Sequence, residues 1–300
     1  MSIEMPAFEP NWERAEVADI MERTTFLDIE TSLVQFYGFR TGMQRPGIDS
    51  LVEGHDQTRL LTAAWGTWWN LYHEGEAGVE SVGNHHDKAA FKADPLDDTY
   101  VLSALWDVLD RSTIIVAHNA SFDAGWIEGR FMELGWKMPS RYFVYCTYQT
   151  LSGKRTVSKK LDFLSQKLCG TEKVSHDGLP LWIGCSNGDV ESFKKMEAYN
   201  IGDIYDTLYK VFMRTAPYVS LNKCIDLAGE GLHCSLTGDE LVEMDELYRN
   251  RHTGLLYTQY CNPKYNIVYR DRYNTRSKKA GQGFIRAQES NQIGQGAYKP

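Results

Sequence analysis

The feature that most constrains this sequence is a short apolar run carrying two acids two residues apart. Residues 25–31 read Thr-Phe-Leu-Asp-Ile-Glu-Thr, and a run of β-branched, aromatic and aliphatic side chains predicts a buried strand. Side chains at i and i+2 of a strand point to the same face, so Asp28 and Glu30 project together while Ile29 turns into the packing. We therefore expect an acidic site on one face of this strand.

Later segments are expected to bring further acids to that place. Residues 113–116 (Thr-Ile-Ile-Val) predict a second buried strand, and a helix is expected from Phe122 to about Leu134. Asp123 in its first turn is favoured by the helix dipole. The last long helical pattern runs from Glu191 to Met213. On that helix Tyr199 and Asp203 are four residues apart and share a face.

Four converging carboxylates indicate a particular chemistry. Without cations they would repel one another and raise each other's pKa. Hard oxygen ligands suit Mg²⁺ or Mn²⁺, and two such ions about 4 Å apart stabilise the attacking and leaving oxygens of an in-line displacement. A tyrosine one turn before the last acid can orient the attacking water. The set predicts a two-metal site for phosphodiester hydrolysis.

In this order the motifs resemble those of the DnaQ-like 3′→5′ exonucleases of the DEDD superfamily, in its tyrosine branch. That branch carries Asp-x-Glu, Asn-x3-Asp and Tyr-x3-Asp. The matching residues are Asp28/Glu30, Asn119/Asp123 and Tyr199/Asp203. The histidine branch has His-x4-Asp in the third motif, whereas Ala198 lies five residues before Asp203. Over roughly its first two-thirds, the chain is similar to phage-encoded exonuclease subunits of DNA polymerases.

The resemblance implies an α/β, RNase H-like mixed sheet flanked by helices. It implies that Asp28, Glu30 and Asp203 hold the tighter metal ion, that Asp28 bridges to a second ion, and that Asp123 supports this one through water. Tyr199 would orient the nucleophile. The implied activity is removal of nucleotides from the 3′ end of single-stranded DNA, with a DNA polymerase or another replisome protein as a partner.

Four residues are candidates for substrate contact, and three of them have a plain structural alternative. Asn119 would brace the site or touch substrate, although an Asn after a strand is often a turn residue. Lys160 falls where relatives place a basic residue, and the start of a solvated helix explains it equally. His118 and Thr31 lie beside the first two motifs, and His118 could equally be a structural histidine.

Composition sets the wider expectations. Three hundred residues that are 42% hydrophobic predict one good core plus a small appendage. We expect no signal peptide and no transmembrane stretch, hence a cytoplasmic protein that does not bind membranes. The six cysteines lack a disulfide-like spacing and read as reduced thiols. The expected domains are an N-terminal arm or helix (1–23), the exonuclease domain (24–218), a ribbon-like module (222–274) and a tail (275–300).

The charge is uneven along the chain. The net charge is −8, yet residues 270–300 hold seven Lys or Arg and two acids. A basic, Gly- and Gln-rich tail can attract phosphates without regard to sequence, while the acidic body concentrates divalent cations. An ordinary disordered terminus is the alternative.

Residues 222–274 depart from the family pattern. Phage relatives often carry a zinc ribbon here with two Cys-x2-Cys pairs, but this chain keeps only Cys234 and Cys261, with Thr237 and Lys264 at the second positions. Neither replacement can act as a thiolate, and Cys224 and His233 could complete a ligand set only at a foreign spacing, so we expect no structural zinc. A small β-rich ribbon-like module remains, whose aromatic and Arg residues favour single strands as ligand. A purely structural cap is the alternative.

Other functions stay open on sequence grounds. The same five catalytic positions serve exoribonucleases, which differ by contacts to the 2′-hydroxyl. A nucleic-acid or replisome binding module could keep the fold without cutting, although an idle site has no reason to keep clustered acids. RNase H-like folds also host endonucleases.

Overall fold

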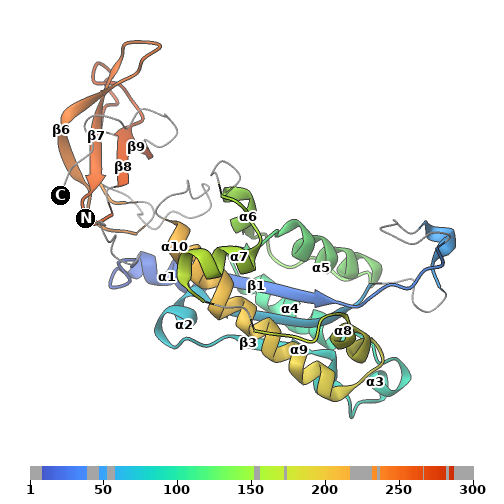
Figure 1. Ribbon diagram of the computed structural model, residues 1–300. Coiled ribbons are helices and arrows are strands. Elements are labelled where there is room, and N and C mark those ends of the chain that lie inside the picture. Colours follow the sequence, from blue (N-terminus) through green and yellow to red (C-terminus); the bar gives the residue numbers. More distant parts are fainter. Residues whose placement is uncertain are drawn as a thin grey trace. The chain divides into compact units, whose positions relative to one another are not determined.

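The structure is a computed structural model that divides into two compact units (Figure 1). The sheet unit is Glu22–Val211, and the terminal unit combines Met1–Met21 with Phe212–Pro300. The residues that the structure describes are 9–38, 47–52, 58–151, 156–171, 174–216, 232–234, 237–265, 267–281 and 284–286.

The sheet unit is built on one mixed five-stranded sheet in the order β3-β2-β1-β4-β5. Its strands are β1 (Thr24–Thr31), β2 (Leu60–Thr67), β3 (Gly78–Ser81), β4 (Ile114–Ala117) and β5 (Phe143–Cys146). The first three pair antiparallel, and β4 and β5 continue parallel to β1. Both strands expected from the sequence are present, and the acid-bearing strand β1 is the central one. The predicted α/β class with a mixed sheet is therefore confirmed.

Helices cover both faces of this sheet (Figure 1). On one face Leu27 and Ile115 line a small cavity together with Leu109 of α4 and Ile127 of α5. On the other face α9 packs across β1, β2 and β3. The helical elements are α1 (Ala15–Arg23), η1 (Ile48–Ser50), α2 (Trp68–His73), η2 (Val82–His85), α3 (Ala89–Ala93), α4 (Thr99–Arg111), α5 (Ser121–Glu133), α6 (Thr147–Thr150), α7 (Leu161–Leu164), η3 (Ser165–Cys169), α8 (Leu179–Ser186), α9 (Val190–Gly202), η4 (Asp203–Tyr209) and α10 (Lys210–Thr215). Within the described ranges, none of these helices has the length and apolar character needed to span a bilayer.

The helix expected over 191–213 is continuous but not regular. It consists of α9, a π-helical segment η4 and α10 in direct succession. The wide turn begins at Asp203, whose carbonyl accepts a hydrogen bond of 2.6 Å from the Thr207 hydroxyl. The expected helix is therefore present, with a π-helical segment inside it, and π-helical turns occur often at functional sites. The helix expected from Phe122 to about Leu134 agrees with α5 (Ser121–Glu133).

The terminal unit carries a four-stranded antiparallel sheet in chain order. Its strands are β6 (Val242–Arg249), β7 (Leu256–Asn262), β8 (Ile267–Asp271) and β9 (Phe284–Arg286). The buried side chains of Tyr260, Tyr269 and Ile267 supply much of its interior. Strand β9 lies inside the segment expected as a tail (275–300) and pairs with β8, and residues 287–300 lie outside the described residues.

The N-terminal arm also belongs to this terminal unit. The Asn11 amide donates to the Thr237 carbonyl at 2.6 Å, and the Arg14 guanidinium donates to the Gly238 carbonyl at 2.8 Å. The sequence predicts an N-terminal arm or helix over residues 1–23 and gives no partner for it. Its hydrogen-bond partners lie more than two hundred residues away in sequence, and no local pattern reveals such partners.

Candidate metal centre

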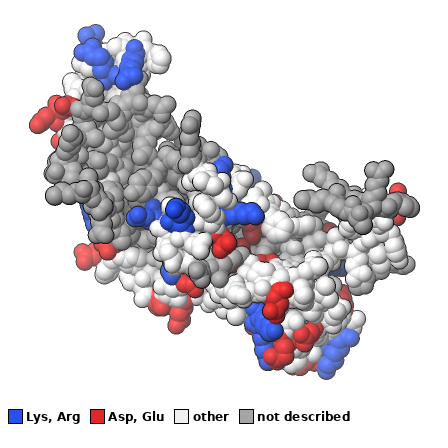
Figure 2. Space-filling model, viewed as in Figure 1, with Lys and Arg blue, Asp and Glu red and all other residues white. Residues whose placement is uncertain are grey.

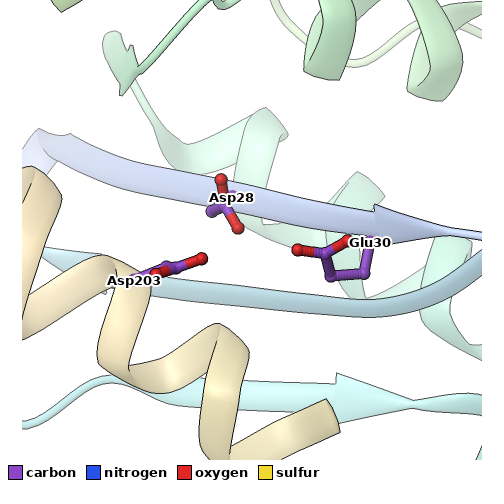
Figure 3. Close-up of side chains that lie close together, drawn as sticks. All are labelled: Asp28, Glu30 and Asp203. Atoms are coloured by element: carbon purple, nitrogen blue, oxygen red, sulfur yellow. The ribbon is translucent and has the colours of Figure 1, made fainter. Parts of the chain in front are cut away.

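Three of the expected acids meet on one face of the sheet (Figure 3). Asp28 and Glu30 come from β1, and Asp203 comes from the junction of α9 and η4. One carboxylate oxygen of each lies within 4.8 Å of the corresponding oxygen of the other two. Asp28 and Glu30 are partly buried and Asp203 is 2% exposed, so solvent reaches the cluster at the two acids of β1.

The register of the sheet explains why the acids have room. Asp28 lies opposite Ala64 on β2, and Glu30 lies opposite Thr62. Cross-strand partners share a face, so small side chains on β2 leave space above the two acids. Leu27 and Ile29 point to the other face and are buried in the main hydrophobic core. The alternation of β1 therefore separates the core from the acidic cluster.

A buried asparagine orients Asp28. The Asn200 side-chain amide donates to the Asp28 carboxylate at 2.6 Å, and its carbonyl oxygen accepts from the Thr62 hydroxyl at 3.0 Å. Both Asn200 and Thr62 are fully buried. Because an ionised carboxylate only accepts hydrogen bonds, the NH₂ group of Asn200 faces Asp28, and the Thr62 hydroxyl, which can donate or accept, donates to the amide oxygen. The chain Thr62–Asn200–Asp28 thus fixes one carboxylate and joins α9 to two strands.

A second polar contact holds α9 on the sheet. The Ser81 hydroxyl of β3 donates to the carboxylate of Glu197, which lies one turn before Asn200. Ser81 pairs with Thr62 across the sheet and is itself fully buried. Buried polar groups need such partners, because an unmade hydrogen bond there costs about 1–3 kcal/mol. The two contacts fix the position of the helix that carries Asp203.

The residue before Asp203 allows a close approach of the chain. A Cβ at Gly202 would lie 2.5 Å from the Cγ2 atom of Val174. Val174 belongs to the segment that precedes α8, and this segment also carries His176. Glycine at position 202 therefore lets residues 174–178 pack directly on the helix next to the cluster.

Asp123 comes from α5 and contacts β1 through a backbone hydrogen bond. Pairing between β1 and β4 ends at Phe26 and Val116, and past that point the Ile29 amide donates to the Asp123 carboxylate at 3.3 Å. Asp123 is 4% exposed. Burial raises the pKa of Asp123 to about 7, although the backbone amides of Asp123 and Ile29 act to lower it. Among the described residues Asp123 is not part of the group of three.

Tyr199 is held in an aromatic cluster. It is 5% exposed, its ring centroid lies 4.7 Å from that of His176, and it lies 6.0 Å from that of Trp182. Both contacts are edge-to-face, the geometry that aromatic pairs prefer. The ring is therefore fixed in place on α9, one turn before Asp203, as the sequence predicts.

The backbone conformation of Asn119 supports the alternative that it is a turn residue. It is exposed and has a φ of 63°, the one positive φ at a non-glycine residue in the described part of the chain. Asn adopts the left-handed region more readily than most residues. Its carbonyl accepts from the Phe122 amide at 2.8 Å. Asn119 thus redirects the chain from β4 into α5 and sets the place of Asp123.

The other expected substrate contacts lie in different surroundings. Both ring nitrogens of His118 have partners, the Thr147 hydroxyl at 2.8 Å and the Lys159 carbonyl at 2.9 Å. His118 therefore holds the segment that leads into α7. Lys160 is exposed at the start of α7, and Thr31 is partly buried at the end of β1. Neither Lys160 nor Thr31 is placed in the group of three carboxylates.

Sequence reasoning missed Asn200, His176 and Trp182. For Asn200 a signal exists, because it stands three residues before Asp203 and so shares the buried side of the helix with it. A polar residue on such a side needs a partner, and the acids on β1 are the polar groups there. His176 and Trp182 carry no comparable signal, because loop packing brings them to Tyr199.

The expected ribbon positions in the terminal unit are occupied by polar contacts within the chain. The Cys234 sulfur lies 3.1 Å from the Tyr269 hydroxyl, and the Asn262 amide donates to the Thr237 hydroxyl at 3.0 Å. Lys264 forms an ion pair of 3.0 Å with Glu9. Cys224 lies outside the described residues. The expectation that this module holds no zinc stays a prediction.

The donor set of the sheet-unit cluster fits a hard divalent cation. All three donors are carboxylate oxygens, which Mg²⁺ and Mn²⁺ prefer over nitrogen and sulfur ligands. Mg²⁺ is commonly held by one to a few carboxylates and keeps several waters. The part of the chain that the structure describes contains no second such group of three acidic, His or Cys residues.

Neither a protein-family model nor a curated protein matches this chain.

Proposed function

We propose that this protein is a Mg²⁺- or Mn²⁺-dependent 3′→5′ exonuclease that hydrolyses phosphodiester bonds of single-stranded DNA. The observation that carries the proposal is the convergence of Asp28, Glu30 and Asp203 within 4.8 Å. These acids come from elements about 170 residues apart in sequence. A buried asparagine further orients one of them.

The topology supports the finer fold proposal. An RNase H-like fold is expected to place its acids on the central strand of a mixed sheet and on a packed helix. Here the order β3-β2-β1-β4-β5 puts β1 in the centre, and α9 delivers Asp203 to it. The cluster is partly buried. A partly buried site suits the end of a single DNA strand better than the middle of a DNA duplex.

Each residue then has a defined task. Asp28, Glu30 and Asp203 would hold the divalent ions, with Asp28 shared between two of them and Asp123 on the side of the second. The bound ions would neutralise charge on the phosphodiester and make a water more acidic. Tyr199 would orient the attacking water through its hydroxyl, and Asn200 would keep the Asp28 carboxylate in place.

The testing experiment uses matched 5′-labelled single-stranded DNA and RNA with Mg²⁺, Mn²⁺ or EDTA. Asp203→Asn is compared with wild type and with Asp206→Asn. Asp206 lies in the same π-helical segment but forms a partly exposed ion pair of 2.8 Å with Lys210. The Asp206 variant therefore repeats the chemical change on the same helix without touching the cluster.

We expect a ladder that shortens from the 3′ end of the DNA, abolished by EDTA and reduced about 100-fold or more by Asp203→Asn. Asp206→Asn should cut at the wild-type rate. A faster ladder on RNA would move the substrate class to RNA. If neither the DNA nor the RNA is shortened and Mn²⁺ binding is still detectable, the proposal is wrong, and a binding module on the same fold is favoured.

A further inference from the structure

The terminal unit concentrates positive charge in one stretch of the chain. Residues 248–281 hold eight Lys or Arg and a single acid, in a chain whose net charge is −8. That acid, Asp271, is 1% exposed, and its carboxylate accepts from the amides of Tyr273 and Gly281. The one negative charge is therefore engaged inside the module, while seven of the eight cations are exposed and Arg270 is partly buried.

The topology gathers six of these cations at one end of the four-stranded sheet. Two connections meet there, the one between β6 and β7 and the one between β8 and β9, and the Thr275 amide of the second donates to the Leu256 carbonyl beside the first at 2.9 Å. Figure 2 shows blue side chains gathered at this end. The exposed cations are Arg249, Arg251, Arg272, Arg276, Lys278 and Lys279, called here the basic end.

Exposed acids of the same unit lie along strand β6, before the basic end. They are Glu243, Asp245 and Glu246, and the strand finishes at Arg249. At about 3.3 Å per residue, the nearest of them, Glu246, lies roughly 10 Å from Arg249 along the strand, and Glu243 lies roughly 20 Å away. Both separations exceed the Debye length of about 8 Å at physiological salt, so these acids offset the positive charge of the basic end only weakly.

Aromatic rings accompany the cations. The Arg270 guanidinium lies 4.7 Å from the ring centroid of Tyr257 and 5.5 Å from that of Tyr248. The Lys279 ammonium lies 5.7 Å from the ring of Tyr273. Tyr257 and Tyr273 are both partly exposed. A planar guanidinium and tyrosine rings are the groups on which unpaired bases stack.

We propose that the basic end binds single-stranded nucleic acid without sequence preference, at a site separate from the carboxylate cluster. Exposed cations from two connections supply phosphate contacts, and Tyr257 with Arg270 supplies a stacking platform. An anionic membrane would use the cations and leave the rings without a role, and a duplex hides its base faces. The assignment stands whether or not the carboxylate cluster cuts.

The test measures binding of 5′-fluorescein-labelled oligo(dT) to the full chain by anisotropy in EDTA, across a salt series. Arg249→Ser/Arg251→Ser/Arg272→Ser is compared with Lys88→Ser/Lys92→Ser/Lys194→Ser, which removes the same charge from exposed sites of the sheet unit. We expect the first variant to bind at least about tenfold more weakly, with a shallower dependence on salt. The second should bind as wild type does. Replacing the same three arginines by lysine should restore most of the affinity.

A charge-neutral variant tests the stacking. Tyr257→Leu keeps the charge and should weaken oligo(dT) binding about fivefold or more. Vesicles of phosphatidylcholine with phosphatidylserine form the parallel arm, and here Tyr257→Leu should change nothing. The proposal is overturned if both triple variants lose affinity equally, if neither loses affinity, or if Tyr257→Leu leaves oligo(dT) binding intact. Because EDTA removes any cutting, these outcomes are independent of exonuclease activity.

Discussion

The acidic cluster of the sheet unit and the ribbon positions of the terminal unit differ in how their polar groups are paired. In the sheet unit three carboxylates of the same charge are brought within 4.8 Å of one another. In the terminal unit the ribbon-like positions are joined by complementary donors and acceptors, such as the Asn262 amide with the Thr237 hydroxyl and with Asp239 at 3.0 Å each. The three carboxylates need a bound cation to relieve their mutual repulsion. The polar groups around Asn262 satisfy one another within the chain.

The size of the difference can be estimated. Two unit charges 4.8 Å apart repel by about 3 kcal/mol at an effective dielectric constant of about 20. Three ionised carboxylates would meet this cost several times over unless protons or cations relieve it. A neutral hydrogen bond such as that of Asn262 instead contributes about 1 kcal/mol. The comparison teaches that cation dependence should be confined to the sheet unit.

The largest expected effect is stabilisation by divalent cations. At a free Mn²⁺ concentration 100 times the dissociation constant, binding to the native state should raise the free energy of unfolding by about 2.7 kcal/mol. Thermal melts with Mn²⁺ or EDTA measure this. In Asp203→Asn the shift should largely disappear, and in Asp206→Asn it should stay. A shift of equal size in all three proteins would mean that the ions act elsewhere.

A somewhat smaller effect concerns pH in the absence of divalent ions. The pKa of Asp123 is raised from 3.8 to about 7, so between these values the native state keeps a proton that the unfolded state releases. The free energy of unfolding should therefore fall as pH rises toward 7, by about 2 kcal/mol between pH 5 and pH 7. Urea titrations in EDTA measure the trend.

Asp123→Asn cannot titrate and should flatten this contribution, whereas Asp107→Asn, at an exposed position of α4, should leave it as in wild type. Saturating Mn²⁺ should oppose the trend, because ions favour the charged carboxylate. An unchanged slope in the Asp123 variant would show that this carboxyl is already ionised at pH 5.

The smallest expected effect lies in the terminal unit. Asn262 is fully buried, donates to Thr237 and Asp239, and accepts from the Lys264 amide at 3.0 Å. Asn262→Ala should lower the free energy of unfolding by about 1–1.5 kcal/mol, equally with EDTA and with added zinc. Lys264→Ala removes only an exposed ion pair and should cost about 0–0.5 kcal/mol. A loss that zinc reverses would reveal a metal site in the ribbon positions.

Sequence reasoning predicted the parts of the sheet unit that depend on local pattern. Strand β1 has an apolar run with alternating acids, and α5 and α9 have clear helical periodicity, so their positions follow from side-chain spacing. Four converging carboxylates were predicted, and among the described residues the structure groups Asp28, Glu30 and Asp203 and leaves Asp123 outside that group. The exonuclease activity inferred from this cluster is a proposal.

What the sequence did not predict depends on distant partners. The place of Asp123 follows from where β4 stops pairing with β1, and neither strand records that length by itself. The π-helical segment that begins at Asp203 contacts β1 and β2, which are distant in sequence. Strand β9 is three residues long in a polar stretch, and only its pairing with β8 makes it a strand.

The pairing of the N-terminal arm has a consequence for the timing of synthesis. The hydrogen bond from Asn11 to Thr237 joins residues 226 positions apart. At an elongation rate of about 5–20 residues per second, the arm waits roughly 10–45 s on a ribosome for that partner to be made. Asp203 is made before that partner, so the acidic cluster can assemble while the terminal unit is still incomplete. The order of synthesis therefore allows a stage with a formed centre and an unfinished second unit.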